Sequence, residues 1–97
     1  MINRNNDKEL KEVLEQLFKA YGWTEKMDGI KIINSWDKVV GGIIANHTTN
    51  LYVKNKILYV KLDSSVLRNE LYMERTNLAN KLNDEIGKKV INEIVFN

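Results

Sequence analysis

The side chains best suited to binding chemistry lie in one short stretch that mixes aromatic, aliphatic and basic residues. Tyr52 and Tyr59 are interleaved with Lys54, Lys56 and Lys61. Aromatic rings can stack on exposed bases and lysines can neutralise phosphates, so this combination is typical of single-strand nucleic-acid binding. The alternative is an ordinary solvent-facing strand pair, in which tyrosines stabilise the sheet and lysines protect its edge from aggregation. Composition alone leaves both interpretations open.

Three further basic residues are candidate phosphate contacts. Lys88 and Lys89 follow the expected end of a helix, where positive charge is also favoured by the helix dipole. We expect Arg4 to lie on a flexible N-terminal arm, residues 1–5, and therefore to be free to reach a partner. Several of the other basic residues alternate with acidic residues at helical spacing, which is typical of solvated ion-pair faces.

The sequence offers little for catalysis or metal binding. It has no cysteine and one histidine, His47, so thiolate sites and paired-histidine sites are excluded. His47 falls at an expected helix end, where it would satisfy terminal carbonyls or meet solvent. No glycine spacing matches a phosphate-binding loop. We therefore expect a binding protein that is not an enzyme and uses no metal, cofactor or small-molecule substrate.

Length and composition indicate one small globular domain, residues 1–97. Hydrophobic residues make up 43% of the chain and charged residues 29%, which is ordinary for a folded protein. The net charge of +2 permits nucleic-acid binding without arguing strongly for it. No apolar run approaches the roughly 18 residues of a membrane span, and the N-terminus does not resemble a secretory signal. We expect a cytoplasmic location and no membrane partner.

Hydrophobic periodicity predicts two helical regions in the first half of the chain. A helix is expected over residues 6–21, with one buried apolar face. A second helical region is expected over roughly residues 29–46, bent or broken at Gly41-Gly42. Trp36 falls on the face of this region that we expect to be buried.

Alternation of apolar and polar residues predicts a β-hairpin over residues 51–62, with its turn around Asn55. A long helix should begin at Asp63 or Ser64 and end at Gly87. One face of the hairpin would carry Leu51, Val53, Leu58, Val60 and Leu62, and the other Tyr52, Lys54, Ile57, Tyr59 and Lys61.

A third strand is expected over residues 90–96, which gives the order α-α-β-β-α-β. The third strand must join the hairpin, because an isolated hairpin is marginally stable in water. The expected fold is a two-layer α+β domain with a three-stranded sheet and helices packed on one face. This arrangement is similar to that of KH-type nucleic-acid-binding domains, although their Gly-x-x-Gly loop is missing here.

Several segments in combination resemble a bacterial protein family. They are Trp36-Asp37-Lys38-Val39-Val40-Gly41, the "Leu-x-Val" hairpin strands, Ser64 followed by Glu70-Leu71, and Leu82-Asn83-x-x-Ile86-Gly87. In this combination, from about Leu10 to Phe96, the chain resembles the DciA family, whose typical member loads the replicative DNA helicase.

The resemblance implies a KH-like domain that binds DNA, contacts the replicative helicase and performs no hydrolytic chemistry. It also implies that Trp36, Gly41, Ser64, Glu70 and Leu71 are signature residues, which the residue patterns make mainly structural. The alternative hypothesis is a protein-interaction module for which nucleic-acid binding is incidental. The two differ in salt dependence, because phosphate contacts make affinity fall as salt rises.

Overall fold

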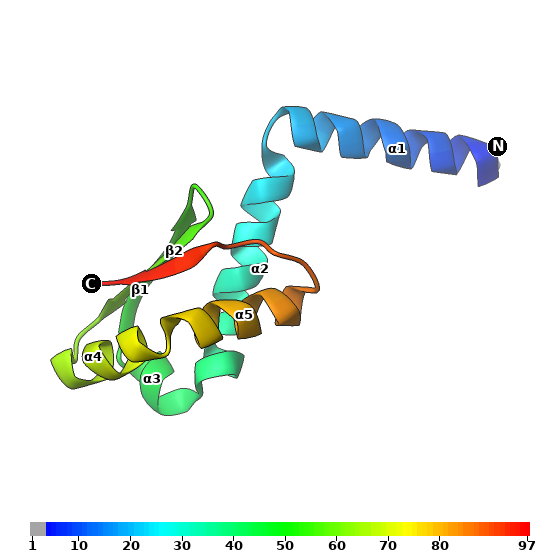
Figure 1. The fold of residues 1–97 in the computed structure, drawn as a ribbon. Coiled ribbons are helices and arrows are strands. Elements are labelled where there is room, and N and C mark those ends of the chain that lie inside the picture. Colours follow the sequence, from blue (N-terminus) through cyan, green and yellow to red (C-terminus); the bar gives the residue numbers. More distant parts are fainter. Residues whose placement is uncertain (1–3) are drawn as a thin grey trace.

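A three-stranded sheet in the order β1-β2-β3 forms one layer of the fold (Figure 1). In this computed structural model, which describes residues 4–97 and the side chains of residues 7–97, β1 (Thr48–Lys54) pairs antiparallel with β2 (Ile57–Leu62). β2 pairs in parallel with β3 (Glu93–Phe96). The third strand therefore joins the hairpin, as the sequence predicts.

Five helices complete the domain in the described part of the chain. Before the sheet come α1 (Arg4–Ala20), α2 (Trp23–Val40) and α3 (Gly42–Asn46), and between β2 and β3 come α4 (Ser65–Met73) and α5 (Arg75–Ile86). Helix α2 packs on β1, α4 on β2 and β3, and α5 on both α2 and β3. The α+β class and the order of helices and strands are confirmed.

The core lies between the sheet and these helices. Trp36 is fully buried, and its indole N–H donates to Thr48 Oγ1 at 3.0 Å. The other fully buried large side chains come from α2, β2, α5 and the segment before β3: Ile32, Leu58, Val60, Leu82 and Ile91. The assignment of Trp36 to the core is confirmed.

Two glycines explain how α2 meets its neighbours. Gly41 has φ 87° and ends α2, which confirms the predicted break, because residues with a Cβ rarely adopt such a positive φ. A Cβ at Gly29 would lie 3.3 Å from the Val53 Cβ. Helix α2 can therefore approach β1 closely at this point.

The long helix predicted to end at Gly87 is correct at its ends and wrong in its middle. Ser64 caps the start by accepting from the Leu67 N–H at 3.3 Å, and Gly87 ends it with φ 88°. Between them Glu74 interrupts the helix, and its N–H donates to the Leu71 carbonyl at 3.0 Å. The break allows α4 to pack on the sheet while α5 packs on α2. No glycine or proline lies at this point of the sequence, so the break could not be predicted from residue types.

The first helix departs most from expectation. It begins at Arg4, and α2 follows after Tyr21 and Gly22, so the second helical region begins at Trp23 and not near residue 29 as expected. Helix α1 contacts α2 and otherwise projects away from the domain (Figure 1). Its apolar residues Leu10, Val13, Leu14 and Leu17 are exposed, so the expected burial of this face is wrong. The short connection directs α2 towards the sheet and leaves α1 beyond the reach of the core.

Candidate nucleic-acid interface

The hairpin separates its side chains onto two faces, as the alternation predicts. Leu58, Val60 and Leu62 are buried beneath the helices. Tyr52 pairs across the strands with Tyr59 on the opposite face. Lys54 and Lys61 lie on that face as well, and both are exposed. We call Tyr52, Lys54, Tyr59 and Lys61 the open sheet face.

The two tyrosines of the open sheet face stack on each other. Their ring centroids are 4.7 Å apart and their planes differ by 10°. Such a cross-strand aromatic pair stabilises the hairpin, which gives the ordinary structural interpretation a physical basis. Tyr52 nevertheless remains 45% exposed, so part of the aromatic pair is open to solvent between two lysines. The geometry allows a base to stack without displacing a core side chain.

The hairpin turn holds a lysine in an unfavourable backbone conformation. Asn55 and Lys56 have φ 52° and 62°, the left-handed pair that a two-residue type I′ turn requires. Asparagine tolerates this region, whereas lysine does so at a cost that glycine would avoid. The backbone of the turn is fixed from the other side by the Asn92 N–H, which donates to the Lys56 carbonyl at 2.7 Å.

The turn also forms one wall of a basic groove. Lys56, Lys88 and Lys89, three of the residues singled out in the sequence, line a hollow of about 440 Å³ together with Lys26 from the first turns of α2. Glu25 and Asp28 line the same hollow. We call these four lysines the lysine groove. Lys26 gave no signal in the sequence, because only the tertiary fold brings α2 beside the hairpin turn.

The lysines of the groove are not equivalent. Lys88 Nζ lies 2.7 Å from Asp28 Oδ2, and the side chains are 51% and 13% exposed respectively. This pair compensates a carboxylate that is mostly withdrawn from water, so Lys88 has a structural role. Lys89 is exposed and makes no ion pair with any side chain from residues 7–97. Its charge therefore remains available to a phosphate.

Asn83 holds the segment that carries Lys88 and Lys89. Its Oδ1 accepts from the N–H groups of Val90 at 2.8 Å and Ile91 at 3.0 Å, and its Nδ2 donates to the Ile91 carbonyl at 2.9 Å. This clamp fixes the chain between α5 and β3. The clamp was not predicted from the sequence, although an asparagine four residues before a helix-ending glycine was a possible signal.

The remaining candidate, Arg4, lies elsewhere. It is the first residue of α1, at the end of that helix farthest from the sheet (Figure 1), and its side chain lies outside the described residues. The backbone does not bring Arg4 to the open sheet face or the lysine groove. Of the expected arm, residues 1–5, positions 4 and 5 are helical and the others also lie outside the described residues.

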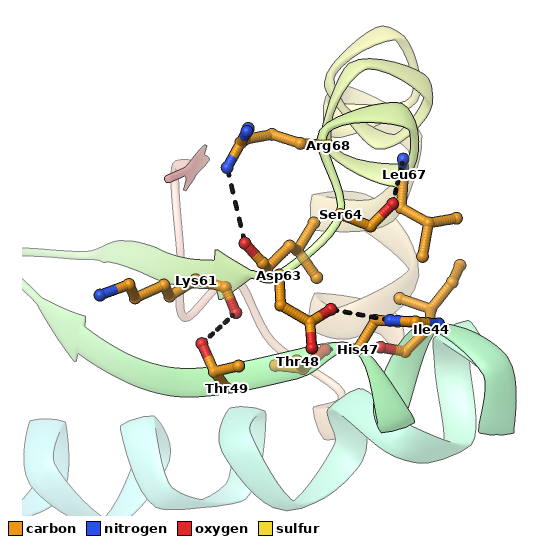
Figure 2. A network of polar contacts seen from close by, with 10 residues as sticks. Ile44, His47, Thr48, Thr49, Lys61, Asp63, Ser64, Leu67 and Arg68 are labelled. Carbon is orange, nitrogen blue, oxygen red and sulfur yellow. Dashed lines mark hydrogen bonds and ion pairs between the residues drawn. The ribbon is translucent and has the colours of Figure 1, made fainter.

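His47 participates in a polar network at the opposite end of the hairpin from the turn. Figure 2 shows His47 Nδ1 paired with Asp63 Oδ1 at 2.7 Å, beside Thr48 and the Ser64 cap. The Asp63 N–H also donates to the His47 carbonyl at 3.0 Å. Among the side chains of residues 7–97, no cluster of three or more His, Asp or Glu residues could hold a metal ion. The pair ties α3 to the start of α4.

Comparison with known proteins places the chain in a family. The family model described as "Dna[CI] antecedent, DciA" matches residues 9–96. The chain belongs to the DciA family. A UPF0232 protein of Corynebacterium glutamicum is 27% identical over 85 residues, covering 88% of this chain and 48% of that protein. A UPF0232 protein of Mycolicibacterium smegmatis is 29% identical over 79 residues, covering 81% of this chain and 41% of that protein. The chain thus spans about half the length of the relatives it matches.

Four of the five signature residues of the DciA resemblance have structural roles in this chain, and Glu70 is exposed. Trp36 fills the core and bonds Thr48, and Gly41 turns α2 into α3. Ser64 caps α4, and Leu71 is buried at the end of the same helix. The family pattern therefore specifies the framework, and the open sheet face and the lysine groove lie outside it.

No helix within residues 4–97 is both long enough and apolar enough to cross a bilayer.

Proposed function

We propose that this chain is a non-enzymatic DNA-binding accessory protein that helps to load or operate the replicative DNA helicase at replication initiation. Membership of the DciA family supports a helicase-loader-like role. The finer assignment to DNA rests on the chain's own surface.

One observation carries the DNA assignment: Lys56 connects the open sheet face to the lysine groove. The turn that holds Lys56 joins the strands bearing Tyr52 and Tyr59, and the same lysine lines the groove with Lys26 and Lys89. A single strand could stack a base on the exposed part of the tyrosine pair and continue with its phosphates along the groove. The tyrosine rings that would stack on bases and the lysine ammonium groups that would contact phosphates then lie along one path of the bound strand.

The turn conformation supports this proposal independently. A lysine kept in a left-handed conformation costs stability that glycine would not cost, and such outliers are often found at functional sites. The position also projects a positive charge from the tip of the hairpin. A binding role gives a reason for lysine at this position.

The proposal is tested by titrating labelled single-stranded and double-stranded DNA with the full chain at two salt concentrations, with and without a replicative helicase. We expect log affinity to fall linearly with log salt, with a shallow slope of roughly −2 to −4 for a few phosphate contacts. We also expect the helicase to join the complex. DNA affinity that does not respond to salt would contradict the phosphate contacts.

A second candidate function is a protein-interaction module with only incidental binding of DNA or RNA. The exposed apolar face of α1 favours it, because a surface helix with an uncovered apolar face is a common protein-docking element. Tight helicase binding together with salt-insensitive, weak DNA binding would favour this alternative.

A further inference from the structure

The apolar face of α1 and its corner is a large uncovered surface on this domain. Leu10, Val13, Leu14 and Leu17 are 41–53% exposed, and Tyr21 is 68% exposed. Phe18 and Tyr21 continue the face to Trp23, with ring centroids 5.4 and 5.9 Å from the Trp23 ring. Within residues 7–97, no element covers this face, because α1 has substantial contacts with α2 alone.

The charges around this face do not suit a polyanion. Along Asp7–Ala20 the acidic residues outnumber the basic ones: Asp7, Glu9, Glu12 and Glu15 against Lys8, Lys11 and Lys19. A DNA-binding helix would instead concentrate positive charge. The near balance of charge also means that two copies of this helix would repel each other only weakly.

The order of apolar residues along α1 is nearly the same in both directions. Reversed about the Glu15–Gln16 peptide, Leu10 meets Tyr21, Val13 meets Phe18, and Leu14 meets Leu17. Two antiparallel copies of the helix would therefore place every one of these apolar side chains opposite another apolar side chain. A two-fold interface requires this kind of self-complementarity, because each copy offers the same surface to the other.

The exposed area is a large part of what a stable dimer interface buries. From their exposed fractions, the large apolar residues of α1 and Trp23 present roughly 600 Å² per chain, the upper end of the about 300–600 Å² expected for the largest patch of a monomer. A stable interface buries about 800 Å² per partner. Burying this face and the polar residues that flank it would approach that value.

We propose that α1 pairs antiparallel with α1 of a second copy of this chain, with the two-fold axis near Glu15 and Gln16, and so forms a homodimer. Each domain follows the C-terminal end of its own α1, so the two domains would lie at opposite ends of a helix pair about 25 Å long. The proposal does not depend on DNA binding.

Sedimentation velocity on the full chain tests the pairing. We expect the native chain to be a dimer at micromolar concentration. We expect Leu14→Glu to weaken the dimer by more than about tenfold, because each interface would bury two unpaired carboxylates. Ile43→Glu is the matched control, because Ile43 is 75% exposed on α3 and should leave the dimer intact. Circular dichroism on both variants verifies that the domain remains folded.

Cross-linking tests the antiparallel direction, and the absence of cysteine in the native sequence makes it simple. Chains with Leu10→Cys should cross-link to chains with Tyr21→Cys, and neither variant should cross-link to itself. In the antiparallel pair the two Leu10 positions are about 16 Å apart along the axis, whereas in a parallel pair they would be adjacent.

Several results would overturn the proposal. A native chain that stays monomeric at about 100 μM, far above the dissociation constants of specific interfaces, would exclude the dimer. Equal dimerisation of the Leu14→Glu and native chains would place the interface elsewhere. If the helicase bound the native monomer and lost the Leu14→Glu variant, α1 would be a docking helix for that partner. Salt-dependent DNA binding that persists in a monomeric Leu14→Glu variant is instead the expected result, because the proposed pairing does not depend on DNA binding.

Discussion

The open sheet face and the apolar face of α1 both come from a periodic pattern of apolar and polar residues. The two elements differ in whether the apolar side chains are buried. In the hairpin, one set of side chains is buried and the other carries rings and lysines to the surface. In α1, the apolar set itself is left uncovered. Periodicity determines which side chains share a face, and it does not determine whether anything covers that face. The first surface suits a polyanion, and the second suits another apolar helix.

The contrast in burial predicts the largest effects on stability. Leu58→Ala removes a fully buried side chain from β2 and should lower the free energy of unfolding by about 2–5 kcal/mol. Leu17→Ala on α1 should change it by less than about 0.5 kcal/mol, because Leu17 supports no core. Urea unfolding at low protein concentration, where any dimer is dissociated, measures both. Equal losses would mean that α1 packs on the domain in solution.

Aromatic stacking on the sheet is the next effect in size. Tyr59→Ala should weaken single-stranded DNA binding by about 1–3 kcal/mol if a base stacks on the tyrosine pair. Tyr72→Ala is the matched control, because Tyr72 is an exposed tyrosine on α4, where the Arg75 guanidinium lies 4.0 Å from its ring centroid. Fluorescence anisotropy at fixed salt provides the measurement. Unchanged affinity in Tyr59→Ala would remove the ring from the site.

A substitution in the hairpin turn should change stability and DNA affinity in opposite directions. Lys56→Gly relieves a left-handed lysine and should raise the free energy of unfolding by up to about 1 kcal/mol. The same change removes a charge shared by the open sheet face and the lysine groove, so DNA affinity should fall while stability rises. Thermal unfolding and a DNA titration on the same variant measure the two effects. A variant that gained stability and kept its affinity would leave Lys56 without a binding role.

The smallest predicted effect distinguishes two adjacent lysines. Lys89→Gln should reduce the magnitude of the salt slope for DNA binding by about one, because an unpaired charge that meets a phosphate is lost. Lys88→Gln should leave the slope almost unchanged and instead lower the melting temperature, since Asp28 would lose its 2.7 Å partner. Titrations at three or more salt concentrations resolve the difference. The reverse result would exchange the roles of the two lysines.

Much of the fold could be predicted from local patterns. The residue types present predict the hairpin faces, the break at Gly41, a helix start at Asp63 or Ser64 and the end at Gly87. The structure confirms them, with Ser64 as the cap. The break at Glu74 could not be predicted, because no residue there disfavours a helix and the cause is the different packing of α4 and α5.

Less of the candidate site could be predicted from the sequence. The tyrosines and the hairpin lysines share a strand pair, so their placement followed from alternation. Lys26 and the clamp made by Asn83 depend on segments that are far apart in the sequence. The pairing of Lys88 with Asp28, which separates it from Lys89, depends on the same long-range approach.

The sequence by itself determined the hairpin, the break at Gly41 and the helix end at Gly87, which faces are apolar, and the framework that the chain shares with the DciA family. These properties depend on interactions between near neighbours, such as capping, turn geometry and periodicity. Only the tertiary structure decided that the apolar face of α1 lies uncovered and that Lys26 joins Lys56 and Lys89 around one groove. Burial and charge pairing are set by which distant segments meet, and local patterns contain no information on that.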